Sequence, residues 1–508
     1  MRIASIAVRT IRWSIAGRGA ARGRTERAAA VLEVRSDGGV VGLGEAAPLP
    51  GMSVDTLEDA ERALAALAHR APFDVADREA AFAIAAGIAG PRTATALEHG
   101  TPPTAAAAPP FGIASPAARF AIETALLDAL ARERGLPLAA LLGGLPGSRP
   151  GAPPEGLPGA APQPAVRPGA RTGSPAGGHV ALCAGPAPVA SPPAREPLAV
   201  PLAAVVDDPD AARAALAAGI RCLKVKLGVC DDPAVVRAIA AATPGARLRI
   251  DANRSWPRAE VPARLACLAD LPVDYVEEPC LDAHRLLAEP LPCRLALDES
   301  LVTLTPDELE AALRSPGLAA VVLKPTLLGG LSVALALGRR AQRAGVAAVA
   351  SHGLEGPVGT AACAELALAL ASLPVAGRAS LSVSGSASGD TSGDTSGDTS
   401  GSPSGDTAGP ASGDTFGSAS GSPSGDTAGS AFISMTPAGL AAHPALTGWQ
   451  IDVPQLGPAH VHAAVAPGLG FAGLELAALL RAIERDRPEP PTLADLDDHD
   501  DGDARYRP

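Results

Sequence analysis

Short apolar runs recur through the middle of the chain, and each one ends in charged or polar residues. Counted from one ending to the next, these groups lie 21 to 27 residues apart. One strand, one covering helix and two short loops need about that many residues. The endings are Lys224–Lys226, Asp251–Asn253, Glu277–Pro279, Asp298–Ser300, Lys324–Pro325 and Ser351–Gly353. Because the carboxyl ends of parallel barrel strands meet on one face, we expect these endings to share one bowl.

Residues 1–145 predict a smaller domain that mixes strands and helices. Alternating apolar positions and helical periodicity place the expected elements over 2–14, 28–35, 56–68 and 116–134. Asp55 precedes the first helix and is its expected N-cap residue. We therefore expect an α+β domain ahead of the barrel.

The rest of the chain alternates strand and helix patterns, which predicts a parallel α/β barrel. The barrel is expected over residues 198–383 and 431–465, with the eighth strand at Ala431–Met435. The segment at 466–486, with a helix over Leu474–Arg485, is expected to return to the first domain, and residues 487–508 form an acidic tail. Two tracts interrupt the chain and are expected to be disordered inserts, because they offer almost nothing for a core. They are a Pro/Gly/Ala-rich tract at 146–197 and Ser-Gly-Asp-Thr repeats at 384–430.

The acidic balance comes from the repeats and the tail rather than from the expected domains. The formal net charge is −12, but six aspartates lie in the repeats and six in the tail. The remainder is near neutral and has no clustered basic face of the kind that binds nucleic acid. Seven cysteines without CxxC spacing favour a reducing compartment. Since no apolar span is long enough for a membrane helix, we expect a cytoplasmic protein that binds no membrane.

Three of the strand endings carry carboxylates: Asp251, Glu277 and Asp298. A single acidic residue at a strand end more often caps the following helix. Three at a similar pitch, flanked by lysines and without a Cys or His cluster, instead indicate a site for a hard divalent cation. We expect Mg²⁺, with Mn²⁺ as a substitute.

The strand endings on either side of the carboxylates carry lysines. Near a metal and partly desolvated, the pKa of a lysine moves toward neutrality, which makes it a base for a carbon acid. We expect Lys226 and Lys324 to act on a small-molecule carboxylate substrate, with Lys224 lowering the pKa of Lys226 by like-charge repulsion. Asn253 is expected to face the same site and to hydrogen-bond a ligand. His352 is expected to be non-catalytic, because the neighbouring strand ends in Lys324 rather than in a carboxylate.

This order of Lys-x-Lys, Asp, Glu, Asp and Lys resembles the enolase superfamily, in its muconate-lactonizing subgroup. Within the superfamily it is most similar to the o-succinylbenzoate synthase family. The segments that carry the resemblance are Gly42–Ser53, Leu138–Gly144, Asp251–Trp256, Val276–Cys280, Leu297–Leu301 and Leu323–Leu327. The likeness covers about 1–145, 198–380 and 431–486.

The resemblance implies a fold, a cofactor and a reaction. The implied fold is a modified (β/α)7β TIM-type barrel with an N-terminal capping domain, whose loop with Gly51 and Ser53 closes over the substrate. The implied cofactor is Mg²⁺ on the three carboxylates, with Lys226 as the base and Lys324 as the cation over the forming ring. The implied reaction is syn-elimination of water from 2-succinyl-6-hydroxy-2,4-cyclohexadiene-1-carboxylate in menaquinone biosynthesis.

Two other functions stay open at this point. One is N-acylamino-acid racemase or dipeptide epimerase activity of the same superfamily, in which both lysines act as acid and base on opposite faces of the substrate. The other is a non-catalytic barrel scaffold. The presence of all five core polar residues argues against the scaffold: Lys226, Asp251, Glu277, Asp298 and Lys324.

Overall fold

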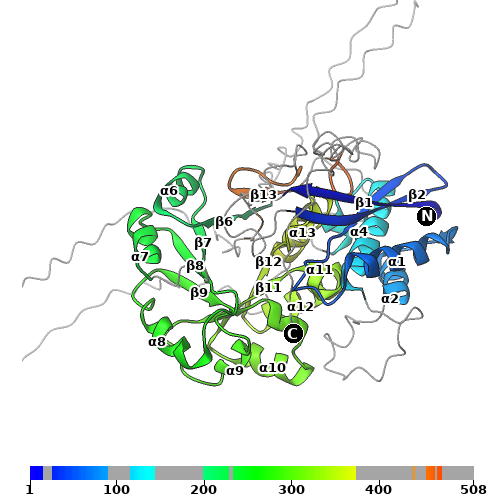
Figure 1. Ribbon diagram of the computed structural model, residues 1–508. Helices are drawn as coiled ribbons and strands as arrows, with labels where there is room; N and C mark the ends of the chain where they lie inside the picture. The colour runs from blue at the N-terminus through cyan, green and yellow to red at the C-terminus, as the bar shows by residue number, and fades with distance from the viewer. Residues whose placement is uncertain are drawn as a thin grey trace, which may run out of the picture. The chain divides into compact units, whose positions relative to one another are not determined.

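The computed structural model describes a capping domain and a barrel (Figure 1). The described residues are 1–14, 26–89, 115–143, 198–227, 233–372, 438, 440, 453–463 and 466–471. The two expected inserts, the acidic tail, the strand expected at Ala431–Met435 and the helix expected at Leu474–Arg485 lie outside them. No helix among the described residues is long and apolar enough to cross a membrane.

The capping domain is an antiparallel sheet covered by helices. Its strands lie in the order β3–β2–β1–β4, with bounds β1 (Arg2–Ser14), β2 (Glu26–Ser36), β3 (Val41–Ala46) and β4 (Phe73–Asp74). Its helices are α1 (Leu57–Ala68), α2 (Arg78–Ala89), α4 (Pro116–Glu133) and the short α5 (Leu138–Leu141). The predicted α+β domain is confirmed.

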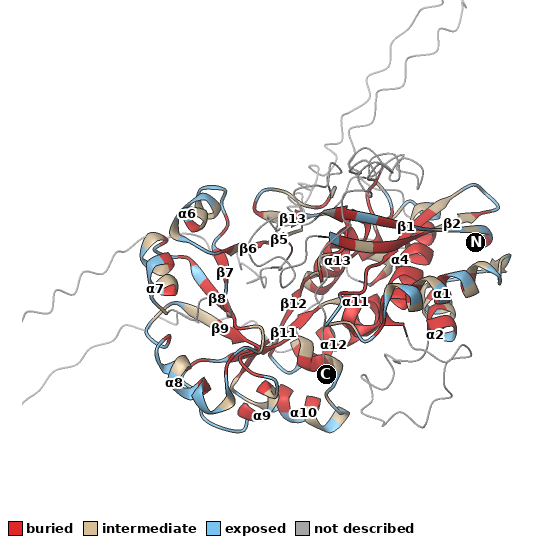
Figure 2. Ribbon diagram, viewed as in Figure 1, coloured by how far each residue is buried: buried red, intermediate tan, exposed pale blue. Residues whose placement is uncertain are grey.

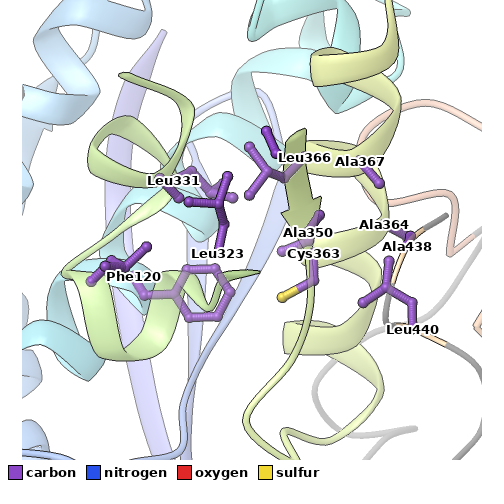
Figure 3. Close-up of a cluster of buried hydrophobic side chains, with 14 of the residues drawn as sticks. Phe120, Leu323, Leu331, Ala350, Cys363, Ala364, Leu366, Ala367, Ala438 and Leu440 are labelled. Atoms are coloured by element: carbon purple, nitrogen blue, oxygen red, sulfur yellow. The ribbon is translucent and has the colours of Figure 1, made fainter. Parts of the chain in front are cut away.

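Helix α4 is buried along most of its length, and Figure 2 shows it almost entirely in the colour of buried residues. On one side it lies against β3, where Gly44 permits the approach, since a Cβ there would lie 2.0 Å from the Ala121 carbonyl oxygen. On the other side it meets the barrel, where Phe120 lies beside Leu323 and Leu331 (Figure 3). One core therefore continues from the cap into the barrel.

The expected N-cap of α1 was wrong by one residue. Thr56 is the N-cap, and its side chain accepts a hydrogen bond from the Asp59 N–H in a capping box. Asp55 is buried and instead accepts hydrogen bonds from Ser115 Oγ at 2.7 Å and from the Ala117 N–H at 3.0 Å. It therefore supports the first turn of α4, a role that depends on tertiary contact rather than on the local sequence.

The barrel sheet has seven parallel strands in chain order, and it curves with helices on its outer side (Figure 1). The strands are β6 (Ala203–Val206), β7 (Cys222–Lys226), β8 (Arg247–Asp251), β9 (Val273–Glu277), β10 (Leu295–Leu297), β11 (Leu318–Leu323) and β12 (Ala347–Ala350). The helices are α6 (Pro209–Ala217), α7 (Pro233–Ala242), α8 (Val261–Ala266), α9 (Ala283–Leu286), α10 (Pro306–Arg314), α11 (Pro325–Leu328), α12 (Leu331–Arg343) and α13 (Pro357–Ala371), with short 3-10 turns η2 (Arg258–Glu260) and η3 (Glu299–Val302). The predicted barrel alternation is confirmed.

Ala438 lies beside the first strand of the barrel sheet. It forms a parallel bridge with Leu202, which directly precedes β6. Leu440 is fully buried and belongs to the same cluster of buried side chains as Cys363 of α13 (Figure 3). Directly before Leu202, β5 (Ala199–Pro201) pairs antiparallel with β13 (His460–His462). The chain thus returns to the edge of β6 a few residues beyond the predicted eighth strand.

The Gly329–Gly330 turn serves packing between the cap and the barrel. Glu123 of α4 accepts hydrogen bonds from the Ser332 N–H at 2.8 Å and from Ser332 Oγ at 2.6 Å. A Cβ on Gly330 would lie 2.5 Å from the Glu123 carboxylate, and the residue has φ of 117°. The Glu123 carboxylate of the cap therefore occupies the N-terminal end of α12.

Candidate active site

The register of the barrel strands brings the predicted polar residues to one level. Lys226 on β7 is the direct partner of Asp251 on β8, and Asp251 is the direct partner of Glu277 on β9. Asp298 and Lys324 directly follow β10 and β11. Five adjacent strands therefore carry these residues at their carboxyl ends, where a parallel barrel places its chemistry.

Two lysine ammonium groups bind carboxylates inside this bowl. Lys224 Nζ lies 2.8 Å from Asp251 Oδ2 and 2.8 Å from Glu277 Oε1. Lys324 Nζ bonds to Asp298 and lies 3.4 Å from Glu299 Oε1. The side chains of Asp251, Glu277 and Asp298 are only 7%, 2% and 3% exposed. The bowl therefore gathers charges of both signs where water has little access.

Lys226 differs from the other two lysines because none of the ion pairs among the described residues involves it. Although it is exposed to the bowl, desolvation by the surrounding protein lowers its pKa; Asp251 opposes that effect, and Lys224 and Lys324 add to it. Desolvation also acts on Lys224, but there Asp251 and Glu277 outweigh it and raise the pKa. Lys226 is therefore the lysine whose surroundings favour the neutral amine.

The three lysines of this bowl are the only lysines in the sequence, which has 42 basic residues in total. Arginine stays protonated in proteins, whereas lysine loses its proton when its surroundings disfavour the charge. The buried cation that pairs with Glu123 in the cap is by contrast an arginine, Arg119. The three cations of the bowl are therefore of the kind that can titrate.

The carboxylates fit a divalent cation by their chemistry. Three buried carboxylates supply the oxygen ligands that Mg²⁺ prefers. Burial would raise the pKa of Asp251, but Lys224 and Lys226 outweigh it and lower the pKa to about 2, so the group stays ionised. Within the described residues no group of three or more His, Cys, Asp or Glu side chains is arranged to hold a metal ion. The ammonium groups of Lys224 and Lys324 bind the carboxylates instead, and a metal would compete with them.

Glu278 is a residue of the site that the sequence interpretation missed. It is fully buried, and its backbone lies in the left-handed region at φ of 42°. Its carboxylate accepts hydrogen bonds from the Asp298 N–H at 2.8 Å and the Ser300 N–H at 2.9 Å, and from Arg254 Nε at 3.0 Å. It therefore fixes the turn that carries Asp298. The second Glu of the Glu-Glu-Pro sequence was the available signal.

Asn253 lies next to the carboxylates, also with left-handed backbone at φ of 47°. Its N–H donates to Asp251 Oδ1 at 3.0 Å, which orients that carboxylate. Left-handed backbone in residues other than glycine costs about 1–3 kcal/mol and is kept where the surroundings impose it. The contribution seen for Asn253 thus comes from its backbone.

Gly51 and Ser53 lie in the cap loop, which we define as residues 47–53. Gly51 has φ of 83°, and Ser53 Oγ accepts a hydrogen bond from the Leu49 N–H at 2.7 Å. These contacts give the loop a closed turn. Among the described residues no hydrogen bond joins either residue to the carboxylate cluster, so the structure does not bring them together with it.

His352 follows the seventh strand of the sheet and is largely buried. Its Nδ1 accepts a hydrogen bond from the Leu354 N–H at 3.1 Å. Desolvation, with further effects from Lys226, Lys324 and Lys224, lowers its pKa to about 4. The ring is therefore neutral at pH 7 and one nitrogen is already committed to the backbone.

Two family profiles match the two parts of this structure. The profile described as "Mandelate racemase / muconate lactonizing enzyme, N-terminal domain" matches residues 5–143, and "Enolase C-terminal domain-like" matches residues 207–384. The chain belongs to the enolase superfamily. Members of this superfamily generally use Mg²⁺.

Curated relatives include o-succinylbenzoate synthases. The protein of that name from Yersinia pseudotuberculosis is 37% identical over 185 residues, which cover 34% of this chain and 54% of the relative. The one from Yersinia pestis is 36% identical over 185 residues with the same coverage. The chain thus matches about half the length of these relatives.

Solved structures of the superfamily share the fold. The L-Ala-D/L-Glu epimerase from Bacillus subtilis is 21% identical with a TM-score of 0.51, covering 73% of this chain and 87% of that one. The dipeptide epimerase from Methylococcus capsulatus, solved with Mg and the dipeptide L-Arg-D-Lys, is 25% identical with a TM-score of 0.50, covering 73% and 88%. The first of these likenesses bears on the fold alone.

Proposed function

We propose that the chain is an o-succinylbenzoate synthase, a Mg²⁺-dependent lyase of menaquinone biosynthesis in the cytoplasm. Its reaction would dehydrate 2-succinyl-6-hydroxy-2,4-cyclohexadiene-1-carboxylate to 2-succinylbenzoate. The observation that carries the proposal is the restriction of lysine to three positions in one bowl of buried carboxylates, with Lys226 outside any ion pair among the described residues. The similarity to curated synthases supports the choice of substrate.

In this proposal Lys226 is the base. Its neutral amine removes the proton next to the substrate carboxylate, and the electrons of that C–H bond form the new ring double bond. The C–O bond at the neighbouring carbon breaks with its electron pair moving to oxygen. Because the two groups leave from the same face, the Lys226 ammonium returns the proton to the departing hydroxyl. Water leaves, the ring becomes aromatic and the amine is restored.

The other charged residues bind and stabilise. Asp251, Glu277 and Asp298 would hold the metal, which when bound supplies a Lewis acid for the negative charge on the substrate carboxylate. Lys324 keeps an ammonium group near the forming ring, where a cation stabilises the developing charge or lies over the ring face. Its contacts with Asp298 and Glu299 favour this charged state.

A dipeptide epimerase or N-acylamino-acid racemase is the second candidate, favoured by the Methylococcus structure at 25% identity. Inversion at a carbon centre needs a base on one face and an acid on the other. Lys226 ends one strand and Lys324 follows another, on either side of the strands that carry the carboxylates, so the arrangement allows inversion. Lys324 pairs with two carboxylates, whereas Lys226 has no ion pair among the described residues. Because only Lys226 is thus suited to be a base, the site supports elimination by one base instead.

The test is an assay of the purified full chain with the cyclohexadiene substrate, with N-succinyl amino acids and with dipeptides. Each is run with Mg²⁺ and then with EDTA. We expect Mg²⁺-dependent formation of 2-succinylbenzoate, lost in EDTA and restored by added Mg²⁺ or Mn²⁺. Faster epimerisation of the amino-acid substrates would favour the second candidate, and full dehydration in a metal-stripped sample would refute the proposed mechanism.

A further inference from the structure

Arg27 joins two loops that come from different domains. It lies on β2 of the cap and is only 3% exposed. Its guanidinium donates to the carbonyls of Pro48 and Ala47 at 2.8 Å each, both in the cap loop. It also donates to the carbonyls of Leu354 and Gly353 at 3.2 Å each, in the loop that follows β12. We define residues 351–356 as the seventh-strand loop.

The seventh-strand loop is in turn tied to the segment that carries Lys324. Glu355 is fully buried and accepts hydrogen bonds from the Gly353 N–H and from Thr326 Oγ1. Thr326 lies in α11, two residues after Lys324. The same loop carries His352, and Leu354 has left-handed backbone at φ of 64°. The shape of this loop is therefore imposed by its surroundings, of which Arg27 is the part contributed by the cap.

A second cap residue holds the far end of the same loop. Glu45 on β3 is buried and accepts hydrogen bonds from the Gly356 N–H at 2.5 Å and the Gly359 N–H at 2.9 Å. This contact fastens the start of α13 to the cap. The start of α13 is thus fixed independently of Arg27, so loss of Arg27 should release the two loops while the domains stay docked.

We propose that Arg27 is a positioning residue that couples the cap loop to the seventh-strand loop, so that the two loops open as one unit. A guanidinium suits this role because its fan of N–H donors bonds to several carbonyls at once. An ammonium group cannot reach four carbonyls spread over two loops. The inference rests on the proposed function for its meaning in turnover, but the coupling itself is independent of which substrate is used.

The experiment compares hydrogen exchange and kinetics in the full chain for Arg27→Met, Arg27→Lys and a matched control, Arg35→Met. Arg35 lies on the same strand, but its side chain is half-exposed and pairs with Glu33 at 2.8 Å. For Arg27→Met we expect amide exchange to rise roughly tenfold in both 47–53 and 351–356, with little change elsewhere. Arg27→Lys should lie between Arg27→Met and wild type, and Arg35→Met should match wild type in both loops.

The kinetic arm uses whichever carboxylate substrate the protein turns over. We expect KM to rise roughly tenfold in Arg27→Met while kcat falls by less than about threefold, because the loops position substrate and take no part in bond breaking. Guanidinium ions at millimolar concentration should lower the KM of Arg27→Ala and leave that of Arg35→Ala unchanged. A merely structural role would lower thermal stability without this rescue.

Several outcomes would overturn the coupling. Faster exchange in only one of the two loops, or in neither, refutes it whatever the activity. If Arg27→Met fails to fold, the wild-type protein decides the question, since coupled loops must show equal opening free energies. Failure of the proposed function would appear differently, as absent dehydration with the exchange pattern intact.

Discussion

Ionisable side chains in two regions of this molecule have different kinds of partner. Between cap and barrel, Arg27 and Glu45 bond to backbone carbonyl and N–H groups. In the bowl, Lys224 and Lys324 bond to the carboxylates of Asp251, Glu277 and Asp298. Backbone groups cannot titrate, so the partners of Arg27 and Glu45 neither gain nor lose a proton. Side-chain pairs can exchange a proton or a metal ion, so the second region is able to do chemistry.

The largest effect that this comparison predicts is at Lys226. Both Lys226→Ala and Lys226→Arg should lower kcat by on the order of 10³-fold or more, because the alanine removes the base and the arginine cannot lose its proton. The measurement is steady-state turnover with circular dichroism to show that the fold persists.

The matched control for this prediction is Arg221→Ala, immediately before the same strand at the opposite end of the barrel, where its guanidinium donates to the Leu216 carbonyl. It should retain nearly wild-type kcat. If Lys226→Arg dehydrates at close to the wild-type rate while Lys324→Ala is inactive, the two lysines have exchanged roles and the assignment is wrong.

Glu278 combines the two kinds of partner. It is a side chain of the bowl, but its partners include backbone N–H groups as well as Arg254. Glu278→Gln removes the negative charge that Arg254 and the Asp298 turn share, so Asp298 loses its fixed position. Residues behind metal ligands typically contribute about 10–100-fold to metal affinity, and we expect a loss in that range. Calorimetric titration with Mg²⁺ or Mn²⁺ measures it without turnover.

Glu260→Gln provides the comparison for this variant, since Glu260 pairs only with Arg264 on the barrel surface among the described residues. An unchanged metal affinity in Glu278→Gln, with the fold intact, would show that Asp298 is positioned by other contacts.

The difference between the two regions also explains what could be predicted from the sequence. The bowl follows from strand periodicity, because residues at the ends of parallel strands must share one face. Lys226, Asp251 and Glu277 are direct partners in the sheet, which agrees with the shared bowl expected from their pitch and from the apolar run before each of them. The restriction of lysine to three positions was also visible in the sequence and would have strengthened the interpretation.

The contacts between cap and barrel could not be found in this way. Arg27 and its partner Leu354 are 327 residues apart, and Glu45 and its partner Gly356 are 311 residues apart. Both contacts involve the backbone of a loop whose conformation depends on the tertiary fold. Asp55 was assigned to the wrong helix for the same reason, since its partner Ser115 lies in a distant segment. The eighth strand stays a prediction, because its expected residues lie outside those that the structure describes.

Lys324 should show a smaller effect that depends on charge. Lys324→Arg keeps a cation beside Asp298 and Glu299, whereas Lys324→Ala leaves the buried Asp298 and the partly buried Glu299 without it. We expect Lys324→Arg to retain roughly tenfold more kcat than Lys324→Ala, because charge stabilisation survives in the first variant only. The incorporation of solvent deuterium into unreacted substrate, measured in both variants, reports separately on proton transfer. Equal loss in both variants would mean that Lys324 transfers a proton, which favours the epimerase alternative.

The smallest effect concerns Glu45 and the stability of the cap contact. Desolvation raises the pKa of Glu45 to about 7, against the opposing hydrogen bonds from Gly359 and Gly356. Between the ordinary value of 4.5 and about 7, the folded protein therefore holds a proton that the unfolded chain has lost. Stability must fall as pH rises through that window, by up to about 1.4 kcal/mol per pH unit from this group.

Urea unfolding at several pH values from 4.5 to 7.5 tests this sign directly. Glu45→Gln cannot ionise, so its free energy of unfolding should decline less steeply with pH than that of the wild type. Glu365, whose pKa burial also raises to about 7, provides the parallel variant Glu365→Gln, and the two flattening effects should add because the groups have no shared partner among the described residues. A Glu45→Gln protein with the wild-type slope would show that Glu45 is ionised throughout, and the cap contact would then contain a permanent charge held by backbone N–H groups.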